Sequence, residues 1–169
     1  VTAKTRISTR AIQNSGMQLS RVSPAGWHME GEDIEPGRTY DITKLDETEE
    51  SRERYYDEIF YKEKYIESYD EERGISFNQT LLVTFSLKYR DYTAGIRRSQ
   101  VERAQRAIAQ GGAKLEKKNQ NDFRRFVKAE NTTKNGEKAT NTKYLLNEAV
   151  IEEEARFDGF YAAMHNLEE

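Results

Sequence analysis

The chain has 169 residues, about one domain in length, and its 36% hydrophobic and 34% charged residues predict an elongated or thin-cored fold with a large wet surface. Its net charge is −3, and it contains no cysteine, which excludes disulfides, thiolate nucleophiles and thiolate metal sites. No apolar run approaches the roughly 18 residues that a membrane helix needs, and no signal peptide is visible, so we expect no membrane partner and a location in a reducing, bacterial cytoplasm.

The N-terminal third of the chain is predicted to be mostly irregular. Glycine and proline on both sides of Trp27 predict loops with one or two short strands over residues 1–38, and Trp27 is expected to plug the edge of the core. Residues 39–45 carry β-branched and aromatic side chains and predict a strand. Residues 46–58 favour either an acidic helix or an exposed loop.

The middle of the chain changes from a period of two to a period of about four. Alternation predicts strands over 58–69 and 79–89, joined as an antiparallel pair by a charged turn that contains glycine. Helical spacing of apolar residues then predicts helices over 93–110 and 114–128. The glycine pair that starts at Gly111 is expected to end the first of these helices.

The C-terminal part returns to β-structure. Residues 129–142 are polar and contain an Asn-Gly pair, which predicts a hairpin tip or a mobile loop. Residues 143–157 are strand-like at their start and helical or extended later, and residues 159–166 predict a final strand.

Together these elements predict an α+β fold. An antiparallel sheet formed by roughly residues 39–89 and the C-terminal segments would carry two or three helices on one face, among them 93–110 and 114–128. We expect one α+β domain over residues 1–150 and a return strand over 151–169.

The search for a catalytic centre finds only weak candidates. His28 lies near several acidic residues, where a hard metal or simply a wet acidic loop is conceivable, and His165 is expected to be a hydrogen-bonded structural histidine. The chain has no Walker-type glycine loop, no GxSxG and no HExxH. A run of carboxylates could bind magnesium or carry out acid–base chemistry. The alternative is that the run is simply a charged, solvated segment. This run consists of Glu152, Glu153, Glu154 and Asp158.

Charge is divided unevenly along the chain. Residues 30–73 hold 17 acidic and 7 basic residues (7 − 17 = −10), whereas residues 88–128 hold 12 basic and 4 acidic residues (12 − 4 = +8). Lysine and arginine at this density are typical of phosphate contacts, and interleaved aromatic residues are able to stack on bases. The candidate aromatic residues are Tyr89, Tyr92, Phe123 and Phe126. The candidate DNA-binding residues are Arg97, Arg98, Arg103, Arg106, Lys117, Lys118, Arg124 and Arg125.

Four patches in a fixed order, contained in three stretches of the sequence, resemble insertion-sequence DDE transposases. The stretches are "FYKEKY", "LLVTFSLKYRDYTAGIRRSQVERAQRAI" and "EEEARFDGFYAAMHNLEE". In the second stretch, "FSLKY" stands where the family has a "YSxKY" pattern, and the residues that match the following helix are Arg98, Gln100, Arg103 and Ala104. The resemblance covers residues 55–169 in patches, and it depends on their order more than on any one of them.

The resemblance implies an RNase H-like parent protein whose three carboxylates bind two Mg²⁺ or Mn²⁺ ions for DNA cleavage and strand transfer. The chain would be an excised piece, the insertion region between the second catalytic aspartate and the catalytic glutamate. It would contribute scaffold and DNA-backbone contacts at transposon ends, with self-association in the intact protein, and would be inactive alone. Asp158 lies in the matching "FDGF", where Asp-Gly also simply makes a turn.

Two other functions remain open from the sequence. The chain is alternatively a structural or protein-interaction domain whose basic helices are neutralised by the acidic segment 30–73. In a third interpretation it is a self-contained metal-dependent enzyme that uses Glu152–Glu154 and Asp158, which requires these carboxylates to converge on one cation site.

Overall fold

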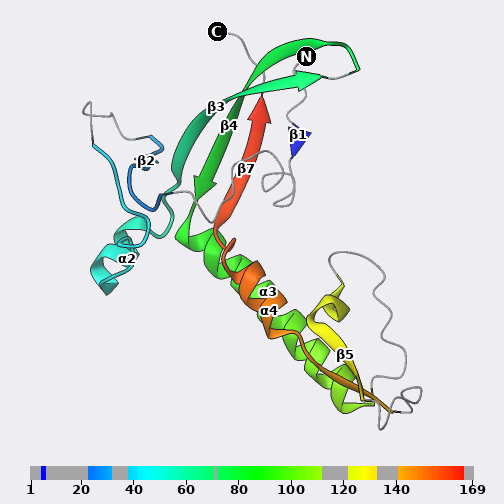
Figure 1. Ribbon diagram of the computed structural model, residues 1–169. Helices are drawn as coiled ribbons and strands as arrows, with labels where there is room; N and C mark the ends of the chain where they lie inside the picture. Colours follow the sequence, from blue (N-terminus) through cyan, green and yellow to red (C-terminus); the bar gives the residue numbers. More distant parts are fainter. Residues whose placement is uncertain are drawn as a thin grey trace. The chain divides into compact units, whose positions relative to one another are not determined.

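The computed structural model describes residues 5–6, 23–31, 38–70, 72–111, 122–132 and 141–165 (Figure 1). These residues fall into two compact units, one within residues 1–92 and 157–169 and the other within residues 93–156. The predicted α+β class with an antiparallel sheet is confirmed. The expected division at residue 150 does not coincide with either boundary of the units.

The first unit is built on an antiparallel sheet with the strand order β1-β7-β4-β3-β2. Its centre is the long β3–β4 hairpin, in which Phe60 pairs with Phe85, and β7 then lies between β4 and β1. The expected antiparallel pair and the expected C-terminal strand are therefore confirmed. The strands are β1 (Thr5–Arg6), β2 (His28–Met29), β3 (Phe60–Asp70), β4 (Ile75–Phe85) and β7 (Phe160–His165).

One face of this sheet carries the hydrophobic core. Phe60, Val83 and Phe85 alternate toward this face and are almost completely buried. Trp27 packs edge-on against Phe85, and its indole N–H donates to the Ser23 carbonyl at 3.1 Å. The expectation that Trp27 closes the edge of the core is confirmed.

The prediction of a strand over residues 39–45 is wrong. Only Tyr40 forms a bridge, to Trp27, and turns follow. The Asp41 carboxylate accepts hydrogen bonds from the Thr43 hydroxyl (2.6 Å) and the Thr43 N–H (3.0 Å), which close a tight turn and lower the pKa of Asp41. The helical alternative for 46–58 is confirmed by α2 (Glu49–Tyr55), which begins with a capping box between Thr48 and Ser51.

The change from strand to helix comes earlier than the sequence predicted. β4 ends at Phe85, and α3 runs over Leu87–Ala109, whereas we expected the strand to continue to residue 89 and the helix to start at 93. The Ser86 N–H donates to the Gly159 carbonyl (3.1 Å), and the Ser86 carbonyl accepts the first helical bond, from the Arg90 N–H (2.9 Å). Leu87 is fully buried, so its side chain fits either pattern and does not mark the boundary.

The second unit contains the later part of α3 and the elements that follow. The prediction of a helix over 114–128 is wrong where the structure describes it, because Asp122 caps a single 3₁₀ turn and the β-branched Val127 begins a strand. Gly111, at φ +91°, follows the end of α3, which confirms the predicted glycine stop. The elements are η2 (Phe123–Phe126), β5 (Val127–Thr132), β6 (Asn141–Leu146) and α4 (Glu148–Ala155).

Strands β5 and β6 form an antiparallel pair in which Val127 faces Leu146. The Asn-Gly pair expected at a hairpin tip lies outside the described residues. The strand-then-helix reading of residues 143–157 is confirmed by β6 and α4. None of the helices in the described part of the chain combines the length and apolarity needed to cross a membrane.

Candidate nucleic-acid interface

The outward side of α3 in the second unit carries three exposed arginines. Ala104 is fully buried and sets the inward side of the helix. Arg103 and Arg106 are three residues apart and therefore neighbours on the helix surface, and Arg98 lies about two turns before Arg106. All three are exposed, whereas Arg97 is half-buried. No described acidic side chain forms an ion pair with Arg98, Arg103 or Arg106.

An aromatic contact connects α3 to η2. The Arg103 guanidinium lies over the Phe123 ring at 5.1 Å from its centroid, and the Arg124 guanidinium lies over the same ring at 5.6 Å. Cation–π contacts of this kind orient a guanidinium without neutralising its charge. Arg103 therefore keeps its positive charge while its position is restrained.

Arg125 is an internal anchor of the second unit, not an exposed cation. Its guanidinium donates to both carboxylate oxygens of Glu154 (2.5 and 2.8 Å), to the Gln100 amide oxygen (2.6 Å) and to the Asp122 carbonyl (3.0 Å). The side chain is 12% exposed and lies over the Phe126 ring. A bidentate pair with Glu154 neutralises this charge inside the fold.

Of the other predicted DNA-binding residues, one pairs with an aspartate and two lie outside the described residues. Arg124 pairs with Asp122 at 3.4 Å, and both side chains are mostly buried. Lys117 and Lys118 lie outside the described residues. No local sequence pattern indicates the Arg125–Glu154 pair, because its partners are separated by 29 residues. The aspartate directly before the Phe-Arg-Arg-Phe run was the one local sign that these arginines have acidic neighbours.

Two of the four candidate stacking residues are exposed. Tyr89 and Tyr92, in the first turns of α3, are 39% and 63% exposed, and their rings stack at 6.1 Å. Phe126 is completely buried, and Phe123 lies under two guanidinium groups. The tyrosines therefore remain as surfaces on which a base could stack, and the phenylalanines hold the second unit together.

The acidic segment 30–73 neutralises the start of α3. The Lys88 ammonium pairs with Asp57 at 2.7 Å, which raises the pKa of Lys88. Arg90 pairs with Asp46. The hydrogen bond from Arg90 holds the pKa of Asp46 below its usual range, against the opposing effect of burial.

The predicted catalytic carboxylates do not come together. Glu153 pairs with Arg156 at 3.0 Å, and Glu154 is bound by Arg125. Asp158 lies in the turn before β7, where the Phe160 N–H donates to the Phe157 carbonyl at 3.2 Å, so the Asp-Gly turn is confirmed. The described residues contain no group of three or more histidine, aspartate or glutamate side chains placed to hold a metal ion.

The two histidines lie on strands. His28 is in β2, where its ring lies 5.6 Å from that of Tyr61, and its acidic neighbours Glu32 and Asp33 lie outside the described residues. His165 is in β7 and pairs with Thr80 of β4.

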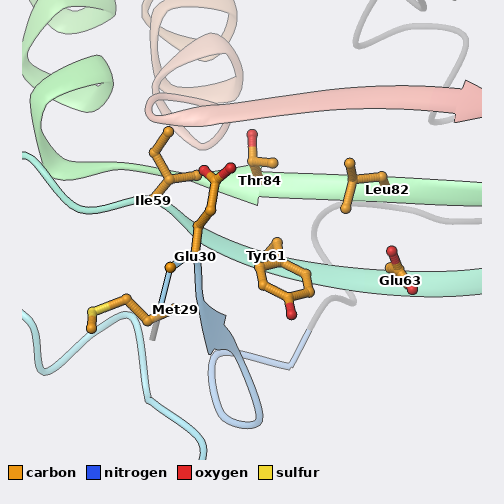
Figure 2. A pocket seen from close by; sticks show the side chains of 8 residues that line it. Met29, Glu30, Ile59, Tyr61, Glu63, Leu82 and Thr84 are labelled. Atoms are coloured by element: carbon orange, nitrogen blue, oxygen red, sulfur yellow. The ribbon is translucent and has the colours of Figure 1, made fainter. Parts of the chain in front are cut away.

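The first unit has a hollow that sequence reasoning did not predict. It has a volume of about 350 Å³ and lies on the side of the sheet opposite the core, beside the turn that follows β2 (Figure 2). Strand alternation indicated that this face exists but not that it would be hollowed. The lining residues are Met29, Glu30, Gly31, Ile59, Tyr61, Glu63, Leu82 and Thr84.

Comparisons of the chain with protein-family models, with curated proteins and with solved structures find no match. The likeness to DDE transposases thus stays a prediction from the order of the sequence stretches.

Proposed function

We propose that this chain is part of a DDE transposase and that the outward side of α3 contacts the DNA backbone. The observation that supports the proposal is the position of Arg98, Arg103 and Arg106, which are exposed on one helix and have no ion-pair partner among the described residues. The ordered stretches that resemble the family connect this helix to transposition. In the intact protein, cleavage and strand transfer would be carried out by metal-binding carboxylates of the RNase H-like core.

The geometry of α3 suits contacts with several phosphates. Arg98 and Arg106 are separated by eight residues, a rise of about 12 Å along the helix. Duplex DNA carries one charge per roughly 1.7 Å of its axis, so such a helix face spans several phosphate groups. Phosphate contacts provide affinity but no sequence reading, and the proposed role is therefore positioning of the DNA.

Fluorescence anisotropy of a labelled short duplex, measured over a salt series, tests the proposal. Each neutralised phosphate contributes about 0.9 to the slope of log K against log salt. We expect the triple variant R98Q/R103Q/R106Q to bind more weakly and to reduce this slope by about 2 to 3. The matched control is K44Q/R54Q/K64Q, which removes the same charge from exposed positions of the first unit.

Equal weakening by both triple variants would mean that binding follows net charge and would contradict a DNA-binding face on α3. Absence of binding by the unmodified chain at low salt would also contradict it. That result would favour the alternative function, a structural or protein-interaction domain. The pairs Lys88–Asp57 and Arg90–Asp46 support this alternative, although they neutralise only the first turn of α3.

A further inference from the structure

The hollow on the first unit lies on the face of the sheet that the core does not use. Tyr61 of β3 pairs with Thr84 of β4, and Glu63 pairs with Leu82. Paired residues point to the same face, and successive residues point to opposite faces. The hollow is therefore formed by two neighbouring cross-strand pairs of the β3–β4 hairpin. Glu30, in the turn after β2, closes it at one side.

The lining combines an apolar floor with two carboxylates. Figure 2 shows the Glu30 side chain passing Ile59 toward Thr84, with Tyr61 near it and with Leu82 and Glu63 farther along the two strands. Glu30 and Glu63 are both exposed, and no described lysine or arginine forms an ion pair with either of them. A site with this lining complements a cationic group that has an apolar stem.

Among the described residues, the edge of β3 next to the hollow is paired over only part of its length. β2 pairs with β3 only at Phe60 and Tyr61, and among the described strands none pairs with the rest of β3 on that side. The Ile59 carbonyl accepts the Glu30 N–H at 2.8 Å and Tyr61 faces His28, so the backbone groups that point toward this edge beyond β2 begin at Glu63. Such an edge is a template for an added strand.

We propose that the hollow binds an arginine side chain carried by an extended segment of a partner protein, which adds to the edge of β3. The alkyl stem would lie on Leu82 and Ile59, the planar guanidinium on the ring of Tyr61, and its N–H groups would donate to Glu30 and Glu63. Arginine suits this lining better than lysine because its guanidinium stacks on aromatic rings and pairs with carboxylates through several donors. The proposal does not depend on DNA binding by α3.

Isothermal titration calorimetry of the full chain with two peptides tests the inference. One peptide has seven residues that alternate valine and threonine around a central arginine, and the other has citrulline in place of the arginine, which keeps the shape without the charge. We expect the arginine peptide to bind about tenfold more tightly, the size expected for two exposed charge pairs. In E30Q/E63Q this preference is expected to disappear, whereas the control E47Q/E53Q, which changes two exposed carboxylates outside the hollow, should keep it.

Equal binding of the two peptides, or a preference that survives in E30Q/E63Q, would overturn the arginine site. The added strand has its own test, because N-methylation of the amides on the pairing edge of the peptide should abolish binding. Unchanged affinity of the methylated peptide, or equally tight binding of free arginine amide, would overturn the strand addition. Trp27 fluorescence checks that each variant keeps the core of the first unit.

Discussion

At Gly159 the backbone has φ +82°, and a Cβ atom built there would lie 2.8 Å from both the Arg90 Cβ and the Phe85 ring, and 3.0 Å from the Ser86 carbonyl. Only glycine fits a position that combines a left-handed conformation with such close neighbours. This glycine lets the turn before β7 come close to the point where β4 ends and α3 begins. A single residue thus positions the last strand against the centre of the sheet.

We expect Gly159→Ala to lower the free energy of unfolding by about 2–4 kcal/mol, because the left-handed strain and the steric overlap add together. The control Gly31→Ala has a similar φ of +76° but no atom within 4 Å, so it should lose only about 1–2 kcal/mol. Urea unfolding followed by Trp27 fluorescence measures both values. Equal losses in the two variants would show that the contacts around Gly159 are unimportant.

At the scale of the elements, the short 3₁₀ helix η2 is held in the second unit by the side chains that flank it. Phe126 is fully buried, and the Asn147 N–H donates to the Phe126 carbonyl at 2.8 Å. Arg125 adds bonds to Glu154 of α4 and Gln100 of α3. This four-residue turn thereby connects α3 to α4, and these contacts favour a short turn over a long helix for this basic run.

Arg125→Ala should destabilise the second unit by about 2–4 kcal/mol, because it leaves Glu154 and Gln100 without their shared donor. Arg98→Ala removes an exposed side chain with the same charge and should change stability by no more than about 0.5 kcal/mol. Because Trp27 lies in the other unit, amide hydrogen exchange over η2 and α4 is the suitable measurement. Unchanged protection in Arg125→Ala together with weaker DNA binding would instead make Arg125 a DNA contact.

At the scale of the whole molecule, part of the unevenly distributed charge is neutralised by ion pairs within the fold. Arg52 and Arg90 connect Asp46 and Asp91, which joins the segment before α2 to the start of α3. These partners come from the acidic and basic stretches that the sequence separates. Among the described residues, the other basic side chains include the exposed arginines of α3, and the other acidic side chains include the two carboxylates of the hollow.

The lowered pKa of Asp46 predicts how stability depends on pH. Because the folded state binds the proton of this carboxyl more weakly than the unfolded state, Asp46 contributes stability above its unfolded pKa of about 3.9. That contribution is lost as the pH falls through the folded pKa. We expect Asp46→Asn to lower the free energy of unfolding at pH 7 by about 1–2 kcal/mol and to flatten its decrease in acid.

Urea titrations between about pH 3 and pH 7, followed by Trp27 fluorescence, measure this dependence. The control is Glu53→Gln, which removes an exposed carboxylate from α2. If Asp46→Asn and Glu53→Gln keep the same acid dependence as the unmodified chain, the ion pairs around Asp46 do not contribute to acid unfolding.

Local sequence patterns by themselves determined the α+β class, the β3–β4 hairpin, the final strand and the glycine stop after α3. These features depend on periodicity and on residues whose backbone preferences act over a few positions. The start of α3 and the turn at Asp41 were missed because Leu87 and the 39–45 segment satisfy a strand pattern equally well. The hydrogen bond between Ser86 and Gly159 determines where α3 starts, and the hydrogen bonds of Thr43 determine the turn at Asp41.

Only the tertiary structure distinguished the exposed arginines from those that are bound within the fold. Arg98 and Arg125 are each the second residue of an arginine pair, yet one is exposed and the other is bound to a carboxylate 29 residues away. The hollow on the sheet likewise needs the register of β3 with β4 and the turn after β2. Contacts between distant segments fix these sites, and no local pattern encodes which distant segments will meet.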